Sequence, residues 1–497
     1  MKKIASLLLA VLLVCTMFPL TGFATIKAQF GDLILSHGSG TKDDPYIISS
    51  YEKLKALADE VNDENYNFEG ISFKLTTNPV HPLKAPIGTK EYPFKGNFDG
   101  GGFIVWLEIN QPDKNNVGLF GYADGSEIKN VYWQGFVTGN NNVGGICGYC
   151  KNGTISNCGY KTILNMDGNV SAMGSYVGGI CGYAENSYIS DCTYTETVTK
   201  KYGSNSGLEG MVGFAGGICG YISGTIENCR NTGTIECGTE EFHKQSDDGY
   251  PRLSDGQDFA GGICGYAEAT IRNCVNKGSV FGESAVGGIV GRVDKNNGIV
   301  ANCTNEGEIY GASQHIGGIG GCLSVDSIMN CINTGTVIEP SSTDTCGGLA
   351  SMIMCSNLIN CISTGNFLPT PNGSYGSFGA DTLIGTIENS YFNKDLCIMG
   401  DAVGASGRLT EYGKTTDELK SDEMLNLLNE YADEYSLLHW VRKENGYPGI
   451  DYTAQTENLL LGSTLSEGNI WIIAGIGAVA VVSVAVIITL KKKKKTA

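Results

Sequence analysis

The sequence has little charge, little proline and little histidine. Only 17% of its 497 residues are charged, and it contains 12 prolines and 5 histidines. It also lacks a sustained apolar period of 3.6 residues between Gly118 and Asn389, which excludes helical repeats such as tetratricopeptide, ankyrin and HEAT arrays. The 70 glycines and 24 tyrosines are instead typical of a β-rich extracellular protein.

Negative charge dominates this chain. The formal net charge is −18, although the first 24 residues carry two lysines and the last seven carry five, with no acid in either segment. The part between them therefore carries about −25. Such a surface argues against nucleic acid as a partner and against direct binding to an anionic membrane surface.

A glycine-rich segment of the type Gly-Gly-Ile-Cys-Gly-Tyr recurs, and a segment of the type Ile-x-Asn-Cys follows it 12 to 15 residues later. The stretch from that asparagine to the next glycine segment is variable, at 14 to 33 residues. The pattern indicates a repeating unit with one rigid half and one half that accepts insertions. The nine pairs are Gly118/Asn130, Gly144/Asn157, Gly178/Asp191, Gly216/Asn228, Gly261/Asn273, Gly287/Asn302, Gly317/Asn330, Gly347/Asn360 and Gly376/Asn389.

Each unit reads as two short strands around a bend, followed in several copies by a third apolar run such as Gly233–Ile235. We predict an all-β fold, a parallel β-solenoid (β-helix) of about nine or more coils that stack roughly 4.8 Å apart. Small α-containing caps and a C-terminal transmembrane helix complete the prediction. A β-propeller or trefoil is the competing fold, but coils as short as 26 residues are too small for a propeller blade.

Stacking predicts columns of identical residues. Side-chain amides can donate to one neighbouring coil and accept from the other, so we expect an asparagine ladder at a bend. Its members are Asn157, Asn228, Asn273, Asn302, Asn330, Asn360 and Asn389. The next position gives a column of cysteines, namely Cys158, Cys192, Cys229, Cys274, Cys303, Cys331 and Cys361.

A second cysteine column contains Cys147, Cys181, Cys219 and Cys264. Buried thiols that stack as small apolar side chains explain both columns best. Disulfides between adjacent coils are the open alternative, because stacked Cα atoms lie close enough to be bridged. A metal site is disfavoured, since Cys147–Cys150 has no second Cys-x-x-Cys motif or histidine pair to complete it.

The chain ends predict secretion and anchoring. Lys2-Lys3, an apolar run and Gly22-Phe23-Ala24 form a secretory signal with cleavage after Ala24. Residues 470–490 are uncharged and long enough to span a bilayer, and five lysines follow them. No proline lies in 456–470, so the segment lacks a Leu-Pro-x-Thr-Gly sorting motif. We expect a single-pass protein of the cell membrane, with its N-terminus and ectodomain outside and its C-terminus in the cytoplasm.

Helices are expected on both sides of the repeats. Ser49 and Glu52 have capping-box spacing ahead of Leu54, Leu57 and Val61, and Ser421–Tyr431 shows a second helical array. The chain is divided into a signal peptide 1–24, an N-terminal cap 25–115, the repeat solenoid 116–394, a C-terminal cap 395–452, a linker 453–469, the transmembrane helix 470–490 and a basic tail 491–497.

Val117-Gly-Leu-Phe-Gly121, Val143-Gly-Gly-Ile-Cys-Gly148 and Thr225-Ile-Glu-Asn-Cys229 resemble the GLUG-motif repeats of bacterial surface proteins. The lead-in segments Gly38–Ser49 and Phe94–Gly100, and the closing segment Leu425–Pro448, resemble the flanks of such repeats. The resemblance implies an adhesin-like cell-surface protein. Some related chains are accessory regions of IgA-cleaving metallopeptidases, but this chain has no His-Glu-x-x-His motif.

We expect a binding or structural protein, not an enzyme, with no cofactor and no metal. Its expected partner is an unidentified host or cell-surface protein or glycan. The large insertions fall in one half of the coil, and one of them carries the candidate ligand-binding residues Phe242, His243, Tyr250 and Arg252. The alternative is a polysaccharide lyase or glycosidase, but the carboxylates form no recurring pair. Asp43, Asp44 and Asp99 could ligate calcium, although turn chemistry explains them more simply.

Overall fold

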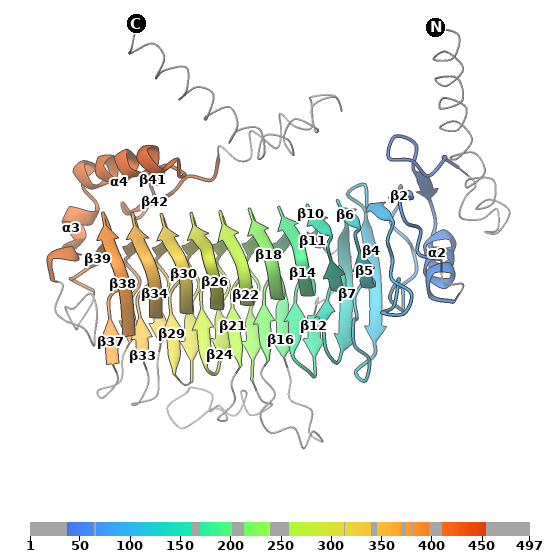
Figure 1. The fold of residues 1–497 in the computed structure, drawn as a ribbon, viewed down its shortest axis with the longest axis horizontal. Helices are drawn as coiled ribbons and strands as arrows, with labels where there is room; N and C mark the ends of the chain where they lie inside the picture. Colours follow the sequence, from blue (N-terminus) through green and yellow to red (C-terminus); the bar gives the residue numbers. More distant parts are fainter. Residues whose placement is uncertain are drawn as a thin grey trace, which may run out of the picture. The chain divides into compact units, whose positions relative to one another are not determined.

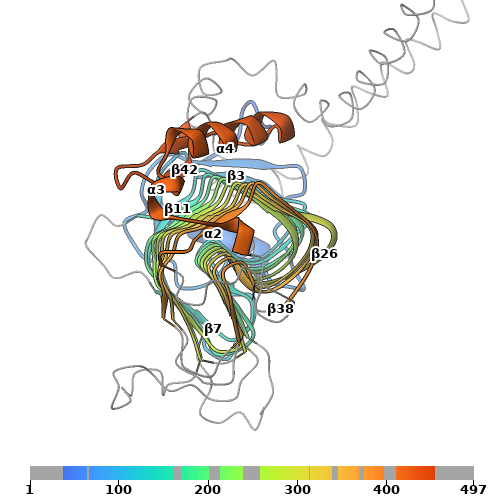
Figure 2. The ribbon, with the colours of Figure 1, turned by 90° about the vertical axis from the view of Figure 1, so that its left-hand side faces the viewer.

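The computed structural model describes residues 37–63, 66–161, 169–200, 213–238, 258–312, 314–338, 345–368, 374–379, 381–396 and 410–453. Described residues up to Ile450 belong to one compact unit. Within this unit the chain winds through about 10 turns of a parallel β-solenoid (Figure 1), which confirms the predicted fold class. Viewed along the axis, successive coils superimpose (Figure 2).

Three parallel sheets form the walls. Sheet A contains β1 (Tyr46–Ile48), β2 (Ser72–Leu75), β3 (Asn97–Asp99), β5 (Phe120–Asp124), β6 (Glu127–Lys129), β9 (Cys147–Lys151), β10 (Thr154–Ser156), β14 (Cys181–Ser190), β18 (Cys219–Glu227), β22 (Cys264–Arg272), β26 (Val290–Ala301), β30 (Gly320–Met329), β34 (Ala350–Ile359) and β38 (Asp381–Glu388). Sheet C contains β8 (Val143–Gly144), β13 (Tyr176–Gly178), β17 (Phe214–Gly216), β21 (Phe259–Gly261), β25 (Ala285–Gly287), β29 (His315–Gly317), β33 (Thr345–Gly347) and β37 (Ser374–Gly376).

Sheet B begins with two long strands, and later coils replace each long strand by two short ones. Its members are β4 (Ile104–Asn110), β7 (Tyr132–Gly139), β11 (Gly159–Tyr160), β12 (Asn169–Ala172), β15 (Thr193–Tyr194), β16 (Thr197–Lys200), β19 (Arg230–Asn231), β20 (Ile235–Cys237), β23 (Val275–Asn276), β24 (Val280–Gly282), β27 (Thr304–Asn305), β28 (Ile309–Gly311), β31 (Ile332–Asn333), β32 (Val337–Ile338), β35 (Ile362–Ser363), β36 (Phe367–Leu368), β39 (Tyr391–Asn393) and β40 (Gly413–Lys414).

The corner between sheets A and B has an unusual backbone conformation. At the second residue of all nine repeat pairs, from Asn130 to Asn389 and including Asp191, φ lies between 45° and 58°. Asparagine and aspartate tolerate this left-handed region better than other residues with a side chain. The corner therefore selects asparagine for its backbone before any side-chain bond is counted.

The same side chains form a hydrogen-bonded ladder. Each amide nitrogen donates to the side-chain oxygen of the preceding coil over 2.7 to 3.1 Å, from Asn130 onto Asp99 through to Asn389 onto Asn360. Asp99, whose carboxylate also accepts from the backbone N–H of Gly101, begins the ladder as a pure acceptor. Asp191 interrupts it, because a carboxylate cannot donate to Asn157.

A second asparagine ladder runs inside the solenoid, and the repeat pattern alone did not reveal it. Asn231, Asn276, Asn305 and Asn333 are fully buried, and each of the first three donates to the next over 2.9 Å. Each side chain also pairs with the backbone of the glycine two residues later, as Asn276 does with Gly278. Buried amides are tolerated here because their hydrogen-bonding groups find partners.

The paired glycines of the motif are explained by close approach. A Cβ on Gly261 would lie 2.0 Å from the carbonyl oxygen of Cys264. A Cβ on Gly262 would lie 2.2 Å from the amide carbon of Asn276, a member of the inner ladder. Neither position has room for a side chain, so the first glycine fits the tight turn and the second fits the inner ladder.

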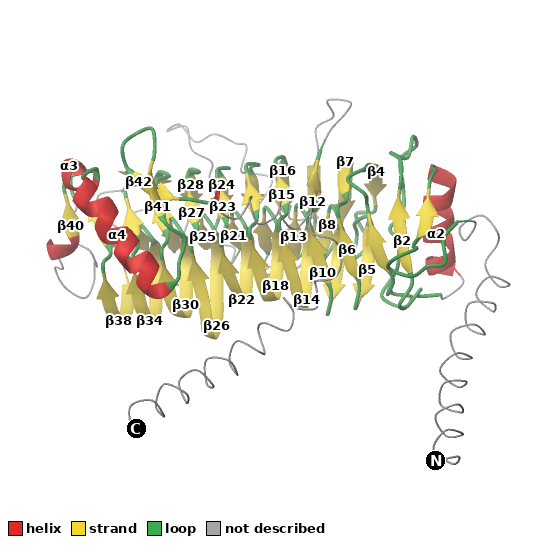
Figure 3. Ribbon diagram, turned by 90° about the horizontal axis from the view of Figure 1, so that it is seen from above, coloured by secondary structure: helices red, strands yellow, loops and turns green. Residues whose placement is uncertain are grey.

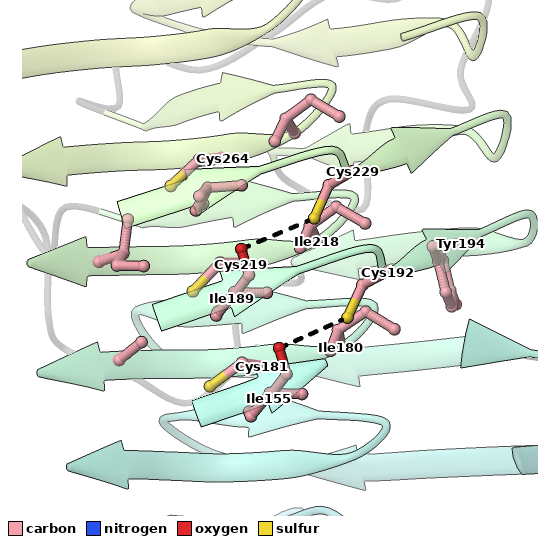
Figure 4. Packing of buried hydrophobic residues seen from close by; sticks show 14 of the residues in the cluster. Ile155, Ile180, Cys181, Ile189, Cys192, Tyr194, Ile218, Cys219, Cys229 and Cys264 are labelled. Carbon is pink, nitrogen blue, oxygen red and sulfur yellow. Dashed lines mark hydrogen bonds between the residues drawn. The ribbon is translucent and has the colours of Figure 1, made fainter. Parts of the chain in front are cut away.

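The cysteine columns line the core (Figure 4). The sixteen cysteines that the structure describes are all buried, and those of the two predicted columns are free thiols. The Cys192 and Cys229 thiols point at the carbonyl oxygens of Ile155 and Ile189, at 3.9 and 4.0 Å. Burial raises the pKa of the Cys158 and Cys229 thiols well above the usual value, so they stay protonated at neutral pH.

Helix α2 (Tyr51–Asp63) lies at the N-terminal end of the solenoid (Figure 1) and buries Leu54, Leu57, Ala58 and Val61, as its periodicity predicts. Its N-terminal cap is one residue later than expected. The hydroxyl of Ser50, not Ser49, accepts from the backbone N–H of Lys53.

The C-terminal elements are η2 (Thr410–Tyr412), α3 (Thr416–Leu419), α4 (Asp422–Tyr435) and the hairpin of β41 (Trp440–Arg442) and β42 (Pro448–Ile450). We expected the helix of this region to cover the open end of the solenoid. Instead α4 lies along the flank of the last coils (Figures 2 and 3). Asn360 and Asn389 donate their amides to the carbonyl oxygens of Leu428 and Leu427, at 3.0 and 3.3 Å.

The position of α4 is explained by the residues that flank the outer ladder. Around Asn360, which bonds to α4, these flanks are buried and apolar at Ile359 and Ile362. Ala301 is a buried apolar flank of Asn302, which bonds to Leu438 just beyond the helix. Along the earlier coils several of the same positions are charged, as at Glu227, Arg230 and Arg272, and the two arginines are exposed. An amphipathic helix therefore gains apolar burial only on the last coils.

Helices of membrane-spanning length and apolarity are not found among the described residues. The predicted signal peptide 1–24 and transmembrane segment 470–490 lie outside them, as do most of the linker and the basic tail.

We predict that Asn330→Ala lowers the free energy of unfolding by about 3 kcal/mol, and that Asn157→Ala lowers it by about 1 kcal/mol. Asn330 is fully buried and bonded to Asn302, Asn360, Leu438 and Trp440, whereas Asn157 is exposed. Both residues have positive φ, so backbone strain is matched between the variants. Urea denaturation followed by circular dichroism measures both, and equal losses would contradict the ladder's role.

Candidate binding face

Five tyrosines stack on the outside of sheet A at the last position of the glycine-rich motif. Their strands pair in register, so the rings form a continuous file. Neighbouring ring centroids are 4.3 to 5.5 Å apart, and the ring planes differ by only 5° to 25°. The file contains Tyr122, Tyr149, Tyr183, Tyr221 and Tyr266.

A second aromatic file runs beside it on sheet C. Tyr176, Phe214 and Phe259 begin β13, β17 and β21, which pair in register. Tyr176 meets Tyr183 edge to face at 5.0 Å, and Phe214 lies 5.4 Å from Tyr266. All eight rings are half-buried, so part of each remains open to solvent. The two files form what we name the aromatic face.

A polar file borders the aromatic face, two residues beyond each tyrosine and two residues beyond Arg292, which follows Tyr266 in the tyrosine file. Tyr149 donates its hydroxyl to the Glu185 carboxylate over 2.5 Å, and Tyr266 donates to Asp294 over 3.3 Å. Lys151 lies 3.7 Å from Glu185. The polar file consists of Asp124, Lys151, Glu185, Ser223, Glu268 and Asp294.

Burial and the carboxylates hold these tyrosines in the neutral form. Burial, followed by the charge of Asp294, raises the pKa of Tyr266 to about 12. Burial and the hydrogen bond to Glu185 raise the pKa of Tyr149, and burial with the Tyr183 and Glu268 neighbours raises that of Tyr221. Their hydroxyl groups are therefore protonated hydrogen-bonding groups at physiological pH.

The face ends where the two files change character. After Tyr266 the tyrosine file continues as Arg292 and Cys322, and after Phe259 the second file continues as Ala285 and His315. The Arg292 guanidinium lies 5.9 Å from the Phe259 ring centre and 2.7 Å from Asp294. The fold thus accepts other residues at both positions, so the rings are not required for coiling.

The loop residues that the sequence predicts as a binding site, Phe242, His243, Tyr250 and Arg252, lie outside the described residues. Segments 201–212 and 239–257, also outside them, connect sheet B strands to β17 and β21. Those strands begin with Phe214 and Phe259, so both insertions rejoin the coil next to the aromatic face. We expected a third insertion, in 160–176, to cluster with these two, but segment 162–168 connects β11 to β12 within sheet B.

The base of these insertions contains a buried ion pair. Lys200, the last residue of β16, lies 3.0 Å from the Asp258 carboxylate, and both side chains are at most 2% exposed. Asp258 also accepts from the backbone N–H of Gly213 over 2.6 Å. The pair joins the described residues that border the two insertions.

Sequence reasoning singled out the insertions and missed the aromatic face. The signal was present, since five successive motifs end in tyrosine and two of the motif strands start with phenylalanine. What the sequence did not reveal was that strand pairing brings the two sets of rings together on one surface.

The chain carries repeats of the GLUG motif. Residues 173–199, 215–236 and 282–310 match the family model described as "The GLUG motif". These stretches lie within the coils, and the first two carry Tyr176, Tyr183 and Tyr221 of the aromatic face.

Similarity to known proteins is partial. A protein of Evansella cellulosilytica, provisionally named a Gly-rich membrane protein, is 30% identical over 130 residues, which is 24% of this chain. The match spans only 14% of that relative's length. A crystal structure from Bacteroides ovatus, of a protein provisionally named an immunoglobulin A1 protease, covers 83% of this chain and 94% of its own at 15% identity and a TM-score of 0.38.

We predict that Lys200→Met lowers the free energy of unfolding by about 3 kcal/mol, because it leaves the Asp258 carboxylate buried without its cation. The matched control is Lys277→Met, which removes an exposed pair with Glu306 and should cost less than about 1 kcal/mol. Denaturant titration of both variants measures the difference, and a loss at Lys200 no larger than the control's would refute the role of the pair.

Raising the pH should destabilise the fold from about pH 10 upward. An unfolded tyrosine ionises near pH 10, whereas Tyr266 in the fold ionises near pH 12, so stability is complete below pH 10 and is lost as the pH approaches 12. The triple variant Tyr149→Phe, Tyr221→Phe, Tyr266→Phe should lose less stability between pH 9 and pH 11.5 than the parent. Thermal midpoints across this range check the expectation, and identical pH profiles would contradict it.

Proposed function

We propose that this chain is a non-catalytic, adhesin-like binding protein, displayed outside the cell on a membrane anchor. The secretory signal, the apolar segment 470–490 and the lysines after it support display and anchoring. The GLUG repeats, and the name of the Evansella cellulosilytica relative, agree with a repeat protein of the membrane surface.

The aromatic face is the observation that carries the proposal. Eight half-exposed rings from five coils form one continuous surface, and soluble proteins rarely expose apolar clusters of this kind without a binding role. The solenoid holds the rings on paired strands, so the surface is rigid before a partner arrives. Such preorganisation lowers the entropy cost of binding.

The insertions next to the face would extend the contact surface. Segments 201–212 and 239–257 join the coil within two residues of Phe214 and Phe259. Long surface segments on a rigid scaffold commonly carry recognition. The candidate residues Phe242, His243, Tyr250 and Arg252 belong to this part of the proposal.

The first test concerns the face. Cells that display the full chain should adhere to host matrix or to neighbouring cells, and Phe214→Ala with Phe259→Thr should weaken adhesion roughly tenfold or more. Ala285 and Thr345 already occupy the same file, so both substitutions suit the coil. Phe136→Ala is the control, because it removes a ring that is 39% exposed on sheet B, away from the face. Equal adhesion of all three cell types would count against the face.

A second test concerns the longer insertion. Residues 240–256 can be removed without touching β20, β21 or the Lys200–Asp258 pair, and the β24–β25 connection shows that two residues suffice to cross this corner. We expect weaker adhesion with unchanged surface levels. Release of reducing sugar or unsaturated products from polysaccharides by the displayed chain would overturn the non-catalytic part of the proposal.

A further inference from the structure

The aromatic face has features that narrow the chemistry of its partner. We infer that the aromatic face is a binding site for an uncharged glycan chain, which lies along the stacked tyrosines and donates hydroxyl hydrogen bonds to the polar file. This inference rests on the proposed binding function. Three observations support it: the orientation of the rings, the local balance of charge and the length of the site.

The tyrosine rings present their edges and hydroxyl groups to a partner. Because adjacent planes differ by 5° to 25° at centroid distances of 4.3 to 5.5 Å, the ring faces between neighbouring tyrosines of the file are covered. Ring edges carry the positive part of the aromatic quadrupole, so the file does not attract cations as an open ring face would. A partner that places oxygen atoms, such as hydroxyl and sugar-ring oxygens, against these edges fits this surface better than an ammonium group does.

Two of the four acids beside the rings, Glu185 and Asp294, are paired with cations of the chain. Glu185 has Lys151 at 3.7 Å and the Tyr149 hydroxyl at 2.5 Å. Asp294 has Arg292 at 2.7 Å and the Tyr266 hydroxyl at 3.3 Å. A polyanionic partner would meet the remaining acids Asp124 and Glu268 and a chain of net charge −18. The balance therefore disfavours a polyanion, and it leaves only Asp124 and Glu268 in the polar file to attract a polycation, whose ammonium groups find no open ring face in the tyrosine file.

Carboxylate and phenol oxygens recur along the face at the coil spacing. A carboxylate accepts several hydrogen bonds, so Glu185 and Asp294 can accept from a partner's hydroxyl groups besides their present donors. A glycan supplies hydroxyl donors and oxygen acceptors in every sugar unit, whereas an apolar peptide supplies few of either. Five strands span about 20 Å, enough for several units of an extended chain.

The experiment uses cells that display the full chain and fluorescein-labelled soluble polysaccharides, read by flow cytometry. The probes are a neutral β-glucan, a neutral galactomannan, the polyanion polygalacturonate and the polycation chitosan. We expect the parent to bind at least one neutral probe, and binding to fall at least tenfold in Phe214→Ala/Phe259→Thr and in Tyr149→Ser/Tyr183→Ser. Phe136→Ala should bind as the parent does, with antibody staining confirming equal display.

Each other outcome overturns the inference. Binding of only the charged probes would show that charge, not the rings, selects the partner. Neutral binding that survives both face variants would place the glycan elsewhere. If no polysaccharide binds while adhesion still depends on Phe214 and Phe259, the glycan inference fails and the proposed binding function stands. If adhesion is also independent of the face, both fail.

Discussion

Register between successive coils is the constraint on which the rest of this structure depends. Parallel pairing places each residue above its equivalent in the preceding coil. Each side chain therefore lies next to the side chains at the same repeat position in the coils above and below. At the corner between sheets A and B, the positive φ limits the choice to residues that tolerate the left-handed region. Asparagine satisfies both demands, because its amide donates to one coil while its oxygen accepts from the other.

Several features of the fold depend on that corner. The ladder passes from Asp99 to Asn389 with a single break at Asp191, where a carboxylate cannot donate. The Asn360 and Asn389 amides, which already donate along the ladder, also donate to backbone carbonyl oxygens of helix α4. Beyond the helix, Leu438 bonds to Asn302 and Asn330, and the Trp440 indole donates to Asn330. The inner ladder obeys the same stacking rule with the opposite direction of donation, and the paired glycines provide the space that it occupies.

The residues on the outside of the coils are less restricted by stacking than the corner and core residues, so binding residues can vary there without loss of the fold. Position by position, the tyrosine file changes to Arg292 and Cys322 without loss of strand pairing. The rings from Tyr122 to Tyr266 are therefore not a requirement of coiling, and their restriction to five neighbouring coils indicates a surface of defined length. The two described flanks of the longest insertions meet the same surface at Phe214 and Phe259.

The sequence alone determined the repeat, the solenoid class and the residues that stack, because a 12 to 15 residue offset between Gly-Gly and Asn admits few other folds. It also identified the helical periodicity of α2 and α4. Only the tertiary structure decided that α4 lies on the flank, since apolar neighbours such as Ile359 and Ile362 are distant in sequence from the helix that covers them. The same reason explains the aromatic face: Tyr221 and Phe259 belong to different strands and different coils, and only lateral pairing of those strands makes them neighbours.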